Sequence, residues 1–286
     1  MKRAFVAVFA LAFCAAPQAL ADDSTAGFSA PGAAQHFTPE VAARFAKQIE
    51  NDLAQQGARV AIVFRTGRAR SQLPGGISYT HGAFWVYQTI HLADGRDAPG
   101  YAVYNLYVGD GAQARTSHLA QDFPVNFTVG AVTDDVAIIV PTPEMQRRIL
   151  LIMGSPRYEQ LHQPSYSLIA NPFELRHQNC NTFMLDVIAA AAWETTDQAQ
   201  IAANLRAHFT PTEVNVSGMQ RLFGPLFDPR VQVDDQHARI VTAGYESMSA
   251  FMLQNGLADR AYVLQRDPNF TLSDIASAAQ LGSRQP

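Results

Sequence analysis

The spacing of apolar residues predicts a long amphipathic helix near the start of the chain. Large apolar side chains recur every four residues at Val41, Phe45, Ile49 and Leu53. This spacing places them on one face of a helix. Thr38 and Pro39 form a favourable start, because threonine caps helices and proline suits the first helical position. We expect this helix to end near Gly57 and to pack its apolar face on a core.

Continuous apolar and aromatic runs predict the strands of a sheet. The stronger runs span residues 59–64, 78–90, 101–108 and 136–140, and weaker ones occur near Phe127 and at 231–233, 239–242 and 261–264. The loop 94–100 contains Asp-Gly and Pro-Gly turn signals. The two strands that it joins therefore most simply form an antiparallel hairpin.

Helical spacing returns later in the chain. Helices are expected at 144–153, 180–192, 197–209, 217–226 and 245–253. Strands and helices do not alternate regularly, and we find neither an internal repeat nor a clear linker. The pattern predicts an α+β fold in which an antiparallel sheet packs on helices.

The N-terminus has the pattern of a secretory signal peptide, residues 1–21. A short basic start, Met1-Lys2-Arg3, precedes an apolar run, and Ala19-Leu20-Ala21 fits a small-residue cleavage site. Residues 22–37 are small and polar, which is typical of a flexible leader. We therefore expect a periplasmic or secreted protein.

Composition narrows the classes of partner. The formal net charge is −4, and loss of Lys2 and Arg3 with the signal peptide would make it more negative. This balance argues against nucleic acid as a partner. No later apolar run is long enough for a transmembrane helix, so no membrane span is expected after signal removal. The 48% apolar content indicates a folded chain.

Cys180 is the first candidate for chemistry. Signal cleavage would remove Cys14, which leaves Cys180 as the single cysteine. Asn179 is a good helix cap, so Cys180 would lie in the first turn of an apolar helix. The free N–H groups of that turn favour a thiolate. The alternative is a small buried apolar residue.

A thiol nucleophile needs a base, and His81 is the best placed histidine. It lies in an aromatic strand, and Gly82 and Ala83 would leave this part of the strand lightly packed. The alternative is a histidine bound to a backbone carbonyl. The group that orients the base should come from the next strand, where Asn105, Asp110 and Asp122 remain open because the sequence does not fix the register.

His177 stands three residues before Cys180, which is a spacing that metal ligands can use. Two ligands do not make a zinc site, and neither a metal nor another cofactor is predicted.

Two short motifs carry a resemblance to known families. Tyr-Thr-His81-Gly-Ala-Phe-Trp precedes Gln-Asn-Cys180-Asn-Thr-Phe by about a hundred residues. This order resembles the circularly permuted branch of the papain-like NlpC/P60 superfamily, which includes the lecithin–retinol acyltransferase-like proteins. The whole chain is also similar to an uncharacterised family of exported bacterial proteins, a domain of unknown function.

The resemblance implies a permuted papain-like core at residues 38–192, with 193–286 as a C-terminal α/β extension packed on it. It implies a cysteine peptidase, amidase or acyltransferase that forms a thioester, with Cys180 as nucleophile and His81 as base. Asn105 is the best match to the family's third polar residue. A peptide, a cell-wall amide or a lipid acyl group is the expected substrate. The alternative function is a non-catalytic periplasmic binding protein that retains the fold.

The resting state of the dyad is a further expectation. We expect a thiolate–imidazolium pair, with the sulfur of Cys180 within hydrogen-bond reach of a ring nitrogen of His81, or slightly further in the absence of substrate.

Overall fold

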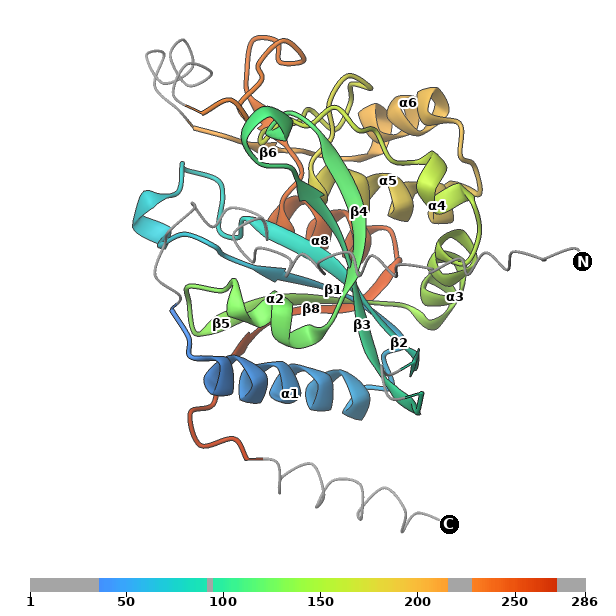
Figure 1. The fold of residues 1–286 in the computed structure, drawn as a ribbon. Coiled ribbons are helices and arrows are strands. Elements are labelled where there is room, and N and C mark those ends of the chain that lie inside the picture. The colour runs from blue at the N-terminus through green and yellow to red at the C-terminus, as the bar shows by residue number, and fades with distance from the viewer. Residues whose placement is uncertain (1–35, 92–94, 216–227, 272–286) are drawn as a thin grey trace, which may run out of the picture.

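The computed structural model describes residues 36–91, 95–215 and 228–271 (Figure 1). A six-stranded sheet, in the order β4-β3-β2-β1-β5-β8, forms its centre. The strands are β1 (Val60–Arg65), β2 (His81–His91), β3 (Asp97–Val108), β4 (Ser117–Asp122), β5 (Asp135–Pro141) and β8 (Ala258–Gln265). Every neighbouring pair is antiparallel, so the expected α+β fold with an antiparallel sheet is confirmed.

Helices cover both faces of this sheet (Figure 1). The helices α1 (Pro39–Gln55) and α2 (Pro124–Val129) pack on one face. The opposite face carries α3 (Pro143–Met153), α5 (Cys180–Trp193) and α8 (Tyr245–Gln254). The other elements of the described residues are α4 (Arg157–Gln160), α6 (Gln198–His208), the short 3₁₀ helices η2 (Arg70–Gln72) and η3 (Gly111–Gln113), and the small sheet of β6 (Thr212–Glu213) and β7 (Val241–Thr242).

The two-sided covering explains why β1 is apolar nearly throughout. All of its residues are buried. Ile62 and Phe64 belong to the core cluster on the α5 face, whereas Ala61 and Val63 belong to the cluster on the α1 face. Successive side chains of a strand point to opposite faces, so a strand in the middle layer needs apolar residues at both sets of positions.

Most expected elements are present. The first helix, the antiparallel β2–β3 hairpin and the Cys180 helix are confirmed, as are the helices near residues 144–153, 197–209 and 245–253. The expected strand at 261–264 is β8, so the chain after residue 192 supplies an edge strand of the central sheet. The expected strand at 239–242 is reduced to β7. The expected helix at 217–226 lies outside the described residues.

Two local predictions are wrong, and one strand was not predicted. Phe127 lies in the helix α2, which begins with Pro124 at its first position, where proline is favoured. Residues 231–233 are not a strand. The strand β4 was missed, because most of its residues are polar and partly exposed at the sheet edge.

Within the described residues, the length and hydropathy of the helices rule out a membrane-spanning helix.

Candidate active site

His81 is the first residue of β2 and is almost completely buried, with 1% of its surface exposed. Its ring stacks on Tyr107 and contacts Phe127 of α2, with both ring centroids 5.7 Å away. The pleat places it on the same face of the sheet as Ala83 and Trp85, beneath α1 and α2. The imidazole therefore lies in a packed, largely apolar environment.

Asn105 of β3 determines which nitrogen of His81 is basic. Its Oδ1 lies 2.9 Å from Nε2 of His81, and its Nδ2 donates to the carbonyl oxygen of Val103 at 3.4 Å. Because the amide NH₂ is directed at that carbonyl, Oδ1 faces the ring and accepts a proton from Nε2. The neutral imidazole then carries its lone pair on Nδ1, which is the nitrogen available as a base.

The two other candidates for orienting His81 lie elsewhere. Asp122 accepts a hydrogen bond from the hydroxyl of Tyr107, the ring that stacks on His81. Asp110 is exposed and precedes η3. Of the three residues left open by the sequence, Asn105 is thus the one in direct contact with the imidazole.

Cys180 is the first residue of α5, and the helix start is closely capped. The Oδ1 of Asn179 accepts from the backbone N–H groups of Asn181 at 3.0 Å and Thr182 at 2.9 Å. The Oγ1 of Thr182 accepts from the backbone N–H of Asn179 at 2.8 Å, which completes a capping box. The position of the thiol is therefore fixed by the local sequence.

The sulfur of Cys180 lies beside β2. The backbone N–H groups of Gly82, Asn181 and Cys180 itself lower the pKa of its thiol, so the sulfur lies near all three. The pairing of β2 with β3 ends at Phe84 and Tyr104, so Gly82 lies where these strands separate. The thiol consequently meets the strand at the residue that follows His81.

Gly82 permits this close approach. A Cβ at this position would collide with Cε of Met184 and would lie 2.8 Å from Cδ1 of Phe64. The expectation of a lightly packed strand is therefore wrong, because α5 fills the space that the missing side chain leaves.

The thiol proton is directed away from the imidazole in this structure. Sγ of Cys180 donates to Oδ1 of Asn181 at 3.7 Å, and Nδ2 of Asn181 donates to the carbonyl oxygen of Ala243 at 3.2 Å. Within residues 36–91, 95–215 and 228–271, no hydrogen bond joins Sγ to the ring of His81. The imidazole packs with Phe127 on the α1 face of the sheet, whereas Cys180 belongs to the buried cluster on the α5 face. Proton transfer from Sγ to Nδ1 would therefore require the start of β2 to rearrange, and a change of the thiol rotamer alone would not suffice.

Electrostatics favour neutral forms of both groups. Burial, followed by the charge of Arg65, lowers the pKa of His81 to about 3, and the hydrogen bond to Asn105 opposes this shift. Burial raises the pKa of Cys180 above its usual value, although the three N–H groups and Arg65 act in the opposite direction. Both pKa shifts favour a thiol and a neutral imidazole over the expected thiolate–imidazolium pair, because desolvation outweighs the helix start.

This result predicts the pH dependence of alkylation. In protein lacking Cys14, iodoacetamide should label native Cys180 more slowly than the unfolded chain below about pH 8.5, because a raised pKa leaves less thiolate at each pH. Labelling rates from pH 6 to 10, measured by mass spectrometry with a urea-unfolded control, provide the test. Rapid native labelling at pH 6 would contradict the neutral thiol.

Arg65 is a residue of the site that sequence reasoning missed. It lies directly opposite His81 in the β1–β2 register and is 0% exposed. Its guanidinium contacts the ring of Phe127 at 5.3 Å and donates to the carbonyl oxygen of Gly130. The sequence signal that could have revealed Arg65 is its charge at the end of an otherwise apolar strand. A fixed positive charge here disfavours imidazolium and favours thiolate.

His177 is engaged away from Cys180. Its Nε2 lies 2.6 Å from Oδ1 of Asp234, and its Nδ1 lies 2.8 Å from Oγ of Ser165. In the described part of the chain, no group of His, Cys, Asp and Glu side chains is suited to hold a metal ion.

Comparison with known proteins gives a match to a protein family. A family model described as an uncharacterised protein conserved in bacteria, DUF2145, covers residues 52–252. No curated protein and no solved structure matches the chain.

Proposed function

The chain belongs to the bacterial DUF2145 family, and we propose that it is a thiol hydrolase or acyltransferase in which Cys180 is acylated. Two neighbouring features carry the proposal. Asn105 fixes the tautomer of His81, and the sulfur of Cys180 lies against the backbone of the next residue, Gly82. The resemblance of the two motifs to the permuted papain-like proteins supports the same assignment.

The reaction begins from the neutral pair. As Sγ bonds to the carbonyl carbon of an amide or ester, the thiol proton passes to Nδ1 of His81, and the positive ring retains its bond to Asn105. The backbone N–H of Cys180 stabilises the developing oxyanion. The C–N or C–O bond then breaks, and the leaving group takes the proton from His81. Water or another acceptor cleaves the thioester and restores the thiol.

An acyl-enzyme is the expected product with an activated ester. Protein lacking Cys14 should gain the mass of one butyryl group from p-nitrophenyl butyrate, located on Cys180 by peptide mapping. The Cys180→Ala variant should gain none and should keep the melting curve of the parent. Equal release of p-nitrophenol by both proteins, with no thioester in the parent, would refute the proposal.

A non-catalytic binding protein is the second candidate. The buried thiol, whose proton is directed at Asn181, favours it because a resting nucleophile is normally more exposed and more acidic. This function is supported instead if an apolar acid binds reversibly, with equal affinity in the parent and in Cys180→Ala, while esters leave no adduct.

Export is part of the proposal. The basic start, apolar run and small-residue site of residues 1–21 support cleavage after Ala21. Protein recovered from the periplasm or medium of an expressing bacterium should therefore have the intact mass of a chain that begins at Asp22. A mass that includes Met1, or a lipid on Cys14, would contradict cleavage after Ala21.

Periplasmic peptides, cell-wall amides and lipid acyl groups are the proposed substrates.

A further inference from the structure

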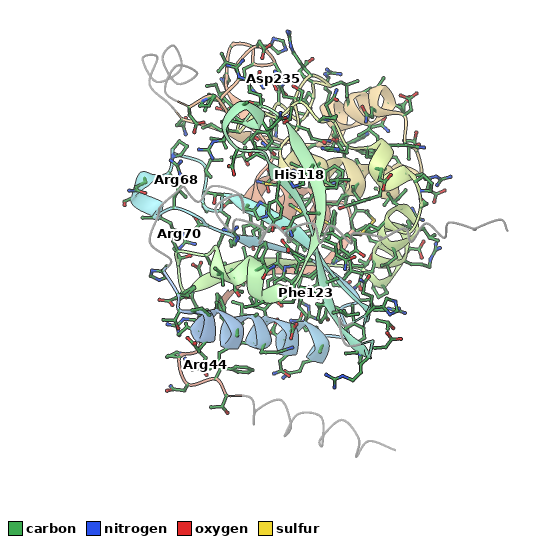
Figure 2. The ribbon with its side chains drawn as sticks, viewed as in Figure 1. Arg44, Arg68, Arg70, His118, Phe123 and Asp235 are labelled. Carbon is green, nitrogen blue, oxygen red and sulfur yellow. The ribbon has the colours of Figure 1, made fainter. Side chains whose placement is uncertain are left out.

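A cavity of about 110 Å³ adjoins Cys180. It extends from a partly exposed rim at Arg68, Gln72 and Pro74 to the start of α5. Figure 2 labels Arg68 on the segment between β1 and β2 that forms this rim. Since Cys180 is buried and lines the cavity, a group bound to its sulfur would extend into this space.

The lining of the cavity is mainly apolar. Its larger aliphatic members are Leu73, Ile77, Leu168, Ile169 and Val214, which come from three separate parts of the chain. Several polar lining groups are already engaged. Thr80 accepts from the backbone N–H of Gly67 at 2.8 Å, and Nδ2 of Asn179 donates to the carbonyl oxygen of Leu168 at 3.1 Å. The lining therefore favours an apolar occupant over a hydroxylated or charged one.

The rim segment is anchored at both ends. Arg70 binds Asp135 of β5 through two hydrogen bonds, at 2.7 and 3.1 Å, and Tyr79 donates to the same carboxylate at 2.8 Å. Gly75 is bridged to Asn215, whose backbone N–H donates to the Gly75 carbonyl oxygen at 2.9 Å. The cavity is thus largely formed before a ligand binds.

We propose that this cavity is the acyl pocket of the enzyme and selects compact apolar acyl groups over long fatty chains. The inference rests on the proposed acylation of Cys180. An apolar cavity of about 150 Å³ holds a benzene molecule, so the present volume fits about four or five carbon atoms. A longer chain would have to leave through the rim into water, where additional methylene groups contribute little.

The p-nitrophenyl esters of acetate, butyrate, hexanoate and decanoate test the size of the pocket. The second-order acylation rate of Cys180 should rise from acetate to butyrate, by about four-fold for each methylene group buried. It should level off or fall from hexanoate to decanoate. A rate that keeps rising through decanoate, or that does not depend on chain length, would overturn the acyl pocket while leaving the acylation itself intact. Failure of every ester to acylate Cys180 would overturn the proposed function as well.

Substitutions at two residues, Ile77 and Leu73, locate the effect in this cavity. Ile77→Ala should move the optimum towards hexanoate, and Ile77→Phe should move it towards acetate. Neither Ile77 nor Leu73 belongs to the two core clusters of the described chain, so Leu73→Ala provides a second enlarged variant that should also fold. Leu151→Ala, an exposed apolar residue of α3, should leave the order of the esters unchanged. If the variants at Ile77 and Leu73 keep the parent order and a parental melting curve, the cavity does not hold the acyl group.

Discussion

Replacement of His81 by glutamine is expected to slow the acylation of Cys180 by about 10²–10⁴-fold, which is the range that a general base contributes. Glutamine has no group that can take the thiol proton at neutral pH. Its amide can still donate to Oδ1 of Asn105, so the hydrogen bond seen at Nε2 has a substitute. Alanine is a poorer choice here, because His81 is fully packed and its truncation would leave a cavity.

Stopped-flow release of p-nitrophenol from the butyrate ester measures this effect, with a melting curve for each protein. His91→Gln is the matched control, because His91 is at the other end of the same strand with 82% of its side chain exposed. It should acylate at the parental rate. If His81→Gln also retains that rate, the thiol proton goes elsewhere, and His81 is a structural residue.

Asn105 is expected to act through His81 as a positioning residue. Asn105→Leu should reduce acylation less than His81→Gln, because the neutral imidazole remains but its tautomer and orientation are no longer fixed. Loss of the acceptor also removes the interaction that favours imidazolium, so the lower limb of the pH–rate profile should move further towards acid. If Asn105 had only a structural role, Asn105→Leu would change the free energy of unfolding and leave the pH–rate profile where it is in the parent.

The position of Cys180 could be predicted because it depends on adjacent residues. Asn179 is recognisable in the sequence as a helix cap, and the apolar run after it predicts the helix. The contact of Asn105 with His81 could not be fixed in advance. Side chains alternate along a strand, so a shift of one residue in the β2–β3 register would have turned Asn105 to the opposite face.

The protonation state was not predictable from the local sequence. A cysteine at a helix start suggests a thiolate, and three backbone N–H groups do favour that form. The opposing contribution is desolvation by residues that are distant in sequence. Tyr166 and Phe64 belong to the same buried cluster as Cys180. The pKa of Cys180 therefore depends on how the folded chain buries the thiol as well as on the N–H groups of the helix start.

Gly82 shows most clearly how packing and chemistry are joined at this site. Gly82→Ala is expected to lower the free energy of unfolding by about 1–3 kcal/mol, the usual cost of adding a methyl group to a close-packed core. Met184 can turn its terminal methyl group aside, but the ring of Phe64 is completely buried and lies 2.8 Å from the added carbon. The ring of Phe64 must then shift, and it packs in the same buried cluster as Met184 and Cys180 of α5. We therefore expect the contact of α5 with β2 to loosen, which separates the sulfur from the N–H of Gly82.

Urea unfolding at a constant m-value measures the loss of stability, and the butyrate ester measures the accompanying loss of acylation. Gly100→Ala is the matched control, because Gly100 lies in the same hairpin and its added carbon would meet only the flexible end of Ile90, at 3.1 Å. Its effect on the free energy of unfolding should stay within about 0.5 kcal/mol.

In the Gly82→Ala background, Phe64→Leu should cost less stability than it does in the parent, since the smaller side chain relieves the contact. Two results would mean that α5 does not depend on this glycine for its approach to the strand. One is that the effects of the two substitutions on stability are additive. The other is that Gly82→Ala is as stable and as reactive as the parent.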